Sequence, residues 1–314
     1  MDIGIARERC EGERRTIILP EGVKRLVEAG HRVFVEKGLG QGVYVNDAAY
    51  RQAGAGVIAG RRNIFNKSLV VKLKAPTTQE FKLLKDNLLF CMLHAGQNPR
   101  YIKALKERNV RAVAMEMILD NKRERLIQCS DMTGEQGMIY AFHLADKSLC
   151  DCAVLVLGYG AVAGGALAVA FSLGAKVKIL RKREYPYIEQ FIKDKDIVVN
   201  AIKWPRDKRE KREYLITRQM LTHLNKGAVV LDLSVDYPSP IEVCRPSSVQ
   251  EPVYTVDGVK YISIYGYPAL VPISSSQRYS SRILPILLKI ASTPLNKLPK
   301  FIRNAVVCPR KGKV

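Results

Sequence analysis

The sequence predicts an α/β fold of two doubly wound, Rossmann-like domains that face a cleft. Short apolar strands alternate with helices along the chain, an order that is typical of parallel sheets. A glycine-rich turn at residues 158–163 stands between an apolar strand and a helix of small residues. The length of 314 residues gives each of two domains enough chain to bury an apolar core.

The first part of the chain contains the elements of one compact domain. Strands are predicted where short apolar runs end in turn residues, at residues 2–6, 31–36, 56–58, 69–73, 87–93 and 111–115. Helices are predicted between them, at residues 20–29, 47–53, 78–84 and 99–108. A final helix at 275–291 is expected to pack back on this domain, so the substrate domain is predicted to comprise residues 1–127 and 274–314.

The remaining residues, 128–273, are predicted to form the dinucleotide-binding domain. A connecting helix is expected at 133–148, with glycines near its start. The predicted strands are residues 152–157, 176–180, 197–202, 228–233 and 261–264, and a helix of small residues at 163–173 joins the first two. This order predicts a parallel sheet.

Composition excludes several classes of protein. Hydrophobic residues make up 47% of the chain and charged residues 26%, which are ordinary values for a soluble globular enzyme. The longest apolar runs, such as 153–157 and 283–288, are too short to cross a bilayer. The charged N-terminus shows no secretory signal, so a cytoplasmic location is expected. The seven cysteines lack metal-ligand spacing, which predicts free thiols and no bound metal.

The chain is strongly basic, with 51 basic against 30 acidic residues and a net charge of +21. No helix-turn-helix, zinc-finger or aromatic RNA-binding signature accompanies this charge, so nucleic acid is not the expected partner. A basic surface attracts anionic small molecules. We therefore expect small-molecule substrates and assembly into a homo-oligomer.

The clearest motif is Gly158-Tyr159-Gly160-Ala161-Val162-Ala163, a G-x-G-x-x-A turn between strand and helix. Gly158 permits the tight turn, Gly160 lets backbone amides approach a pyrophosphate, and Ala163 lets the helix pack close to the strand. The N-terminus of the helix offers N–H groups to phosphates. Small residues also serve close packing alone, but strand, turn, helix and second strand in this order favour a dinucleotide site.

The end of the second strand indicates which dinucleotide binds. An NAD site has a carboxylate there for the ribose hydroxyls. Here the strand at 176–180 runs into Arg181, Lys182 and Arg183, with no acid before Glu184. Arginine can pair bidentately with a 2′-phosphate. The sequence therefore favours NADPH over NADH, although a solvated basic turn is the alternative explanation.

Three kinds of side chain in the substrate domain fit a keto or amino acid substrate. Such a substrate needs a cation for its carboxylate, a donor for its carbonyl and a proton-transfer group with a pKa near neutral. Arg15 precedes an apolar stretch, Lys72 and Lys74 alternate at a strand end, and His94 follows another strand. Taken alone, the arginine and the lysines could equally be surface charges, and His94 could equally be a structural histidine.

Six short segments spread over nearly the whole chain form a recognisable set. They are Ile3-Gly4-Ile5 with Gly12-Glu13-Arg14-Arg15 and Leu19-Pro20; Val71-Lys72-Leu73-Lys74-Ala75-Pro76; Leu93-His94; Thr133-Gly134 with Gly137; Leu231-Asp232-Leu233-Ser234-Val235-Asp236; and Tyr267-Pro268-Ala269-Leu270-Val271-Pro272 with Ser274-Ser275. Together they resemble the alanine dehydrogenase, transhydrogenase and saccharopine dehydrogenase superfamily. Within that group the closest resemblance is to the N5-(carboxyethyl)ornithine synthases.

This resemblance implies a role for each matching residue. Arg15 would clamp the keto-acid carboxylate, and Lys74 would bind its carboxylate or carbonyl oxygen and take part in catalysis. His94 would be the general acid and base. Asp236 would orient the nicotinamide side or a protonated amine, and Thr133 and Asp232 would contact the cofactor.

The departures from the pattern bear on the amine substrate. Alanine dehydrogenases follow the aspartate with glutamine and two glycines, whereas Tyr237 and Pro238 follow Asp236 here. The asparagine that they carry before the proline segment is replaced by Gly266-Tyr267. These differences disfavour free ammonia, so we expect NADPH-dependent condensation of a pyruvate-like keto acid with an amino acid such as ornithine or lysine. The alternatives are reductive amination by ammonia, a saccharopine-type reaction, and a non-catalytic NADP-binding regulator.

Overall fold

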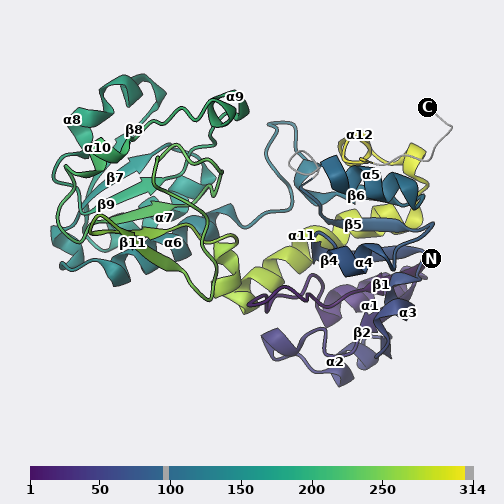
Figure 1. Cartoon of the computed structure of the whole chain (residues 1–314). Helices are drawn as coiled ribbons and strands as arrows, with labels where there is room; N and C mark the ends of the chain where they lie inside the picture. The colour runs from purple at the N-terminus through teal and green to yellow at the C-terminus, as the bar shows by residue number, and fades with distance from the viewer. Residues whose placement is uncertain (95–98, 308–314) are drawn as a thin grey trace. The chain divides into compact units, whose positions relative to one another are not determined.

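The computed structural model describes residues 1–94 and 99–307. The chain divides into two compact units (Figure 1). The first unit comprises Met1–Gln128 with Pro272–Val314, and the second unit is Cys129–Val271. Both contain a largely parallel sheet, which confirms the predicted α/β class with two Rossmann-like units.

The first unit contains a six-stranded parallel sheet in the order β3-β2-β1-β4-β5-β6. Its strands are β1 Asp2–Ile5, β2 Arg32–Glu36, β3 Gly56–Ile58, β4 Leu69–Lys74, β5 Leu88–Met92 and β6 Arg111–Ala114. Ile3 pairs with Val33 of β2 on one side and with Leu69 of β4 on the other. The strand order therefore reverses at β1, and the carboxyl end of a sheet at such a point is where α/β proteins bind ligands.

Helices cover both faces of this sheet. The helices of the unit are α1 Pro20–Glu28, α2 Asp47–Gln52, α3 Arg61–Phe65, α4 Thr78–Phe81, α5 Pro99–Glu107, α11 Pro272–Ser292 and α12 Lys300–Arg303, with 3-10 turns η1 Gln41–Val43, η2 Met115–Met117 and η6 Leu295–Lys297. The C-terminal helix α11 joins the N-terminal segment through Ser276 Oγ, which accepts a hydrogen bond from Thr16 N at 3.0 Å. Ser280 Oγ accepts another from Leu19 N at 3.0 Å.

Helix α4 is shorter than the predicted 78–84 and ends at Phe81. Its start follows from a capping box, in which the Thr77 side chain accepts from Glu80 N and the Glu80 side chain accepts from Thr77 N. The same Glu80 side chain also binds Lys72 and Arg61. The short helix thus places the Glu80 carboxylate beside Lys72 of β4.

The second unit has the strand order β11-β12-β10-β9-β7-β8. Its strands are β7 Ala153–Leu157, β8 Lys176–Leu180, β9 Ile197–Asn200, β10 Val229–Asp232, β11 Val253–Val256 and β12 Val259–Ile262. The five predicted strands pair in parallel, and a sixth strand that was not predicted, β11, pairs with β12 in antiparallel register at one edge. Asp257 and Gly258 join them with φ of 52° and 76°, the left-handed pair that a tight hairpin requires.

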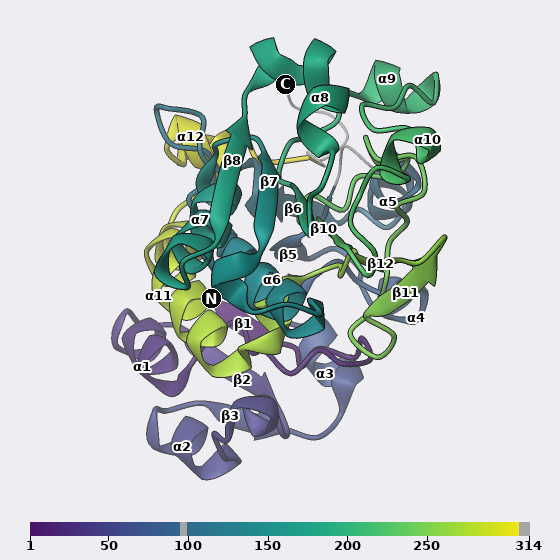
Figure 2. The same cartoon turned by 90° about the vertical axis from the view of Figure 1, so that its left-hand side faces the viewer.

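Alternate residues of these strands face two separate cores. One core contains Val154, Val156 and Val199 together with residues of α6 Ser130–Leu144 and α7 Ala161–Ser172. The other contains Leu155 and Val198 together with residues of α8 Ile188–Ile192 and α10 Arg218–Leu221. Figure 2 shows α7 on one side of β7 and β8, and α8 on the other. The remaining short helices are α9 Arg206–Glu210, η3 Leu149–Asp151, η4 Lys182–Tyr187 and η5 Tyr267–Leu270.

The connecting helix α6 begins three residues before the predicted start at 133 and ends four before the predicted end at 148. It packs on α7 through glycines. A Cβ atom on Gly134 would lie 1.9 Å from the Val162 carbonyl oxygen, and one on Gly165 would lie 2.0 Å from that of Asp131. Only glycine permits this approach, so the two helices hold the start of α7 firmly in place.

Within the described ranges, no helix is both long and apolar enough to span a membrane. The same residues contain no group of three or more His, Cys, Asp or Glu side chains that could hold a metal ion.

Candidate active site

The dinucleotide motif folds as a turn between β7 and α7. Gly158 has a φ of 98°, and a Cβ there would lie 2.7 Å from Ile202 Cγ2, so both conformation and space require glycine. Gly160 is the N-cap of α7, and nothing lies within 4 Å of the position that its Cβ would take. Ala163 is fully buried. The open side of Gly160 at the start of a 12-residue helix fits a pyrophosphate, whose charge the helix N-terminus favours.

The three basic residues after β8 are exposed. The Arg181 guanidinium lies 5.5 Å from the ring centroid of Tyr159, the residue between the two glycines of the turn. The backbone N–H of Arg181 donates to Glu184 Oε2 at 2.9 Å. Among the described residues, none of Arg181, Lys182 and Arg183 forms a salt bridge with a carboxylate. The basic group therefore borders the turn, and Glu184, whose pKa is lowered by that hydrogen bond and by the charge of Arg183, is its nearby carboxylate.

Asp232 lies at the end of β10 and is 1% exposed. Its carboxylate accepts hydrogen bonds from Asn200 Nδ2, the backbone N–H groups of Ser234 and Val235, and Ser263 Oγ, at 2.8–3.2 Å. Burial raises the pKa of this carboxyl above its usual range. These contacts assign Asp232 to the support of the loop that follows β10, and a direct contact with the cofactor stays a prediction.

Asp236, at the end of that loop, has two partners that the sequence did not reveal. Its Oδ2 accepts a hydrogen bond from Trp204 N at 2.9 Å, and its Oδ1 lies 3.6 Å from Arg209 Nη1. Thr133, on the first turn of α6, donates through Oγ1 to Cys129 O at 3.1 Å. The structure places all three of Asp232, Asp236 and Thr133 in the second unit.

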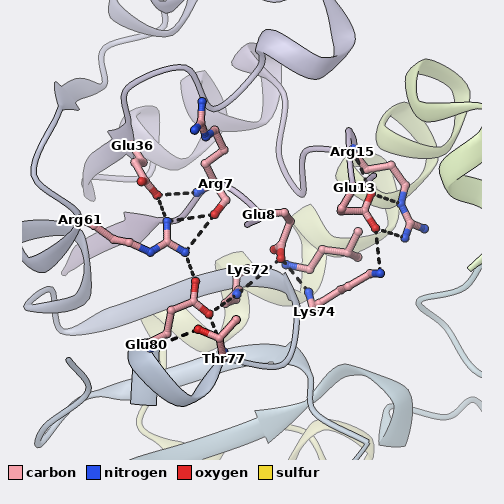
Figure 3. A network of polar contacts seen from close by, with 11 residues as sticks. Arg7, Glu8, Glu13, Arg15, Glu36, Arg61, Lys72, Lys74, Thr77 and Glu80 are labelled. Atoms are coloured by element: carbon pink, nitrogen blue, oxygen red, sulfur yellow. Dashed lines mark hydrogen bonds and ion pairs between the residues drawn. The ribbon is translucent and has the colours of Figure 1, made fainter. Parts of the chain in front are cut away.

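In the first unit, the structure brings Arg15 and Lys74 together on one carboxylate (Figure 3). Arg15 Nε lies 2.7 Å from Glu13 Oε1, and Lys74 Nζ lies 3.3 Å from Glu13 Oε2. The Glu13 side chain is fully buried, and the Arg15 side chain is 5% exposed. Burial alone would raise the pKa of Glu13, but the hydrogen bond and charge of Arg15, with the charge of Lys74, lower it below its usual range. Glu13 is therefore an ionised anchor that fixes two cations.

A hollow of about 280 Å³ adjoins Arg15. Its walls are formed by Glu8, Glu13, Arg14, Arg15, Leu39 and Gly42, together with Arg7, Gly38 and Gln41. We call it the small hollow. A three-carbon acid is small enough for a space of this size.

His94 lies two residues beyond β5 and has a φ of 50°, which is a left-handed conformation. Apart from glycine, the residues that adopt this conformation most often are asparagine, aspartate and histidine. It is half-buried. Burial lowers its pKa below 6.5, the charges of Arg125 and Lys74 lower it further, and Glu116 opposes them. The side chain is therefore neutral at pH 7 and lies within electrostatic reach of Lys74.

Lys72, considered beside Lys74 in the sequence, has a different position. It is fully buried, with Nζ 2.7 Å from Glu80 Oε2 and 3.5 Å from Glu8 Oε2. Figure 3 shows this network continuing through Glu80 to Arg61 and Glu36. Lys72 is a structural cation, and of the two lysines only Lys74 lies beside Arg15.

Glu8 links the structural network to the candidate site. Its Oε1 accepts hydrogen bonds from the backbone N–H groups of Leu73 at 2.7 Å and Lys74 at 3.4 Å, where the pairing of β4 with β5 is irregular. Burial raises its pKa, and Lys72 only partly offsets this effect. Glu8 thus fixes the backbone from which the Lys74 side chain extends.

The comparisons with known proteins agree with the two-unit fold. The N-terminal domain model of the alanine dehydrogenase/PNT family matches residues 4–134, and its C-terminal domain model matches residues 180–314. The chain belongs to this family. It is accordingly an enzyme, a nicotinamide-dependent oxidoreductase that acts on a CH–NH group. The predicted superfamily is therefore confirmed.

Individual relatives support the same assignment. The alanine dehydrogenase of Staphylococcus saprophyticus is 30% identical, over 93% of this chain and 88% of the relative, and that of Methanococcus maripaludis is 27% identical over the same shares. A solved L-alanine dehydrogenase is 26% identical and superimposes with a TM-score of 0.85 over 98% of this chain and 94% of its own. A transhydrogenase from Sinorhizobium meliloti shares the fold, with a TM-score of 0.83, 23% identity and 98% of each chain covered.

Proposed function

We propose that the enzyme joins a pyruvate-like 2-keto acid to the amino group of an amino acid, such as ornithine or lysine, and reduces the resulting imine with NADPH. The product is an N-(carboxyalkyl) amino acid. The observation that carries the proposal is the pair of cations Arg15 and Lys74 on one buried carboxylate, beside a hollow of keto-acid size and within electrostatic reach of His94.

Each of these residues has a defined part in the proposed reaction. Arg15 binds the keto-acid carboxylate, and Lys74 donates a hydrogen bond to the carbonyl oxygen, which favours attack by the amine. As the C–N bond forms, neutral His94 accepts a proton from the nitrogen and passes it to the carbonyl oxygen, which gives the carbinolamine. A second proton moves from the nitrogen through His94 to the hydroxyl group, which leaves as water and gives the imine.

A nicotinamide cofactor, when bound, would supply the hydride for the imine carbon, and a proton from solvent would complete the secondary amine. Gly158 and Gly160 would hold the cofactor's pyrophosphate at the start of α7, and Arg181 to Arg183 would pair with a 2′-phosphate. NADH remains the alternative cofactor.

The second candidate is reductive amination by ammonia, which the similarity to alanine dehydrogenases favours. Against it stand Tyr237 and Pro238 after Asp236, in place of the glutamine and glycines of alanine dehydrogenases. The saccharopine-type reaction differs from our proposal only in using a larger keto acid.

NADPH oxidation with pyruvate and a panel of amines tests the proposal. We expect oxidation with ornithine or lysine and none with ammonia. Oxidation with ammonia alone would refute the proposal and establish reductive amination. Tight NADPH binding without oxidation by any pair of substrates would favour the non-catalytic regulator.

Arg15→Ala should raise the KM for the keto acid by about 10- to 150-fold. This factor corresponds to the loss of one charge-assisted hydrogen bond, which contributes about 1.5–3 kcal/mol. Steady-state kinetics at saturating amine measures it. Arg25→Ala, which removes an exposed arginine of α1, is the matched control and should change nothing. An unchanged KM in Arg15→Ala would refute the carboxylate clamp.

The double variant R181Q/R183Q should weaken NADPH binding by about 10- to 150-fold and leave the Kd for NADH unchanged, because only NADPH carries the 2′-phosphate. Titration of nicotinamide fluorescence gives both constants without turnover. K176Q/K193Q removes two other exposed charges of the same unit as a control. Equal weakening of both cofactors would show that the basic turn does not select NADPH.

A further inference from the structure

A second, larger hollow adjoins the small one. Its volume is about 660 Å³, and the two share Arg7, Gly38 and Gln41 as lining residues. The large hollow lies at the carboxyl ends of β1 and β2, since Glu36 ends β2 and Arg7 follows β1 by two residues. Ligands of α/β sheets bind at such ends.

The positive charge in the large hollow is not balanced by its own carboxylates. Glu36 already binds Arg9 at 2.7 Å, Arg61, and the backbone N–H of Arg7 at 2.9 Å. The guanidinium of Arg7 points away from Lys72 (Figure 3), and its contact with Gln41 Oε1 is long, at 3.4 Å. Within the described ranges, neither Arg7 nor Lys37 forms a salt bridge with a carboxylate. Arg7 and Lys37 thus line the hollow without a salt bridge to a carboxylate of the described residues.

A negative charge is also present, on the same wall. Asp47 lines the large hollow and is half-buried. Its Oδ1 accepts a hydrogen bond from Gly38 N at 2.8 Å, and among the described residues it forms no salt bridge. A Cβ atom added to Gly38 would lie 3.0 Å from Arg7 Nη1. The cation and the carboxylate therefore flank the same glycine. Paired charges of opposite sign are complementary to a zwitterion.

We propose that the large hollow binds the head group of the amino-acid substrate, with Arg7 and Lys37 on its α-carboxylate and Asp47 on its α-ammonium. This inference rests on the proposed function, because it assumes that the amine is an amino acid. Because the two hollows share Arg7, Gly38 and Gln41, the side chain of such a substrate would extend from the large hollow toward the keto acid beside Arg15. Ammonia has no group that would use this subsite.

The test compares ornithine with 1-aminobutane, which has a primary amine but no head group. In the double variant R7M/K37M, the ratio of kcat/KM for ornithine to that for 1-aminobutane should fall by about 10- to 100-fold, the range of a charge-assisted hydrogen bond. The backbone groups of Arg7 that contact Glu36 and Arg61 are kept in this variant. Asp47→Asn should lower the same ratio. An unchanged ratio in both variants would overturn the proposal.

Two controls separate this inference from others. K24M/K82M removes two exposed lysines that line neither hollow and should leave the ratio unchanged. Lys37→Met alone replaces an exposed side chain, so a loss of ornithine selectivity there cannot come from misfolding. If the wild type oxidises NADPH with no amine, calorimetry can measure the binding of ornithine in the presence of NADP⁺. Ornithine binding to the wild type that is lost in R7M/K37M would support the subsite even though the proposed reaction would be wrong. Absence of ornithine binding to the wild type would overturn both the amino-acid subsite and the proposed reaction.

Discussion

Replacing His94 by asparagine should lower kcat by about 10²- to 10⁴-fold while the Kd for NADPH stays unchanged, because only the proton-transfer group is removed. Asparagine suits this position better than alanine, since His94 has a φ of 50° and asparagine tolerates that conformation. A loss of activity then reports chemistry and not backbone strain. Pre-steady-state NADPH oxidation measures the rate, and cofactor fluorescence measures the binding.

The pH profile gives an independent readout of the same residue. Because the pKa of His94 lies below 6.5, the imidazole is neutral at pH 7 and can accept a proton. The kcat/KM of the wild type should therefore fall as the pH drops through that pKa, at pH values below 6.5. His143→Asn, at an exposed position of α6, is the matched control. Full activity in His94→Asn, or an acid limb that persists in it, would refute the assignment.

Most strands and the order of the units follow from local patterns in the sequence. Each strand of the first unit lies within one residue of the predicted ends, because its apolar run stops at residues that cannot continue a strand. The edge hairpin of β11 and β12 was missed, although Asp257-Gly258 is a hairpin signal, because the alternation elsewhere suggested only parallel pairing. Short helices such as α9 have too few residues to show a period.

The site was predicted in part, and the missing part is its carboxylates. Lys74 and His94 stand at strand ends, Arg15 stands in the segment before α1, and all three belong to recognisable segments, so their residue types suffice to propose them. Glu13 could have been found from its place two residues before Arg15, but its contact with Lys74 depends on how β1 and β4 pair.

The alternation of residues alone does not distinguish Lys72 from Lys74, although the family resemblance implies a role for Lys74 only. Alternation gives both lysines the same expected direction, whereas Glu80 and Glu8 bind one and Glu13 binds the other. Those carboxylates come from two separate parts of the chain, the segment after β1 and helix α4. Which lysine is structural is therefore a property of the folded sheet, and a substitution can test it.

Lys72→Met should destabilise the first unit by about 3–5 kcal/mol at pH 7, because it leaves buried carboxylates without their cation. Lys82→Met, at an exposed position, should change stability by less than about 0.5 kcal/mol. The only tryptophan, Trp204, lies in the second unit, so hydrogen exchange at β1 and β4 is the measurement that reports on the correct unit. Equal stability of the two variants would contradict a structural role for Lys72.

The pH dependence of this loss identifies the carboxylate responsible. Glu80 keeps Arg61 in the variant, whereas Glu8 Oε2, which has no hydrogen-bond partner among the described residues, loses the lysine next to it. The pKa of Glu8 is already raised above 4.5 by burial, and removing Lys72 raises it further. A raised carboxyl pKa means that the folded unit binds more protons than the unfolded chain, so stability falls as the pH rises through that pKa. The deficit of Lys72→Met should therefore shrink as the pH is lowered toward 4.5, and K72M/E8Q should recover part of it at pH 7. If the loss of stability in Lys72→Met is independent of pH and unaffected by Glu8→Gln, then it arises from altered packing and not from the charge of Glu8.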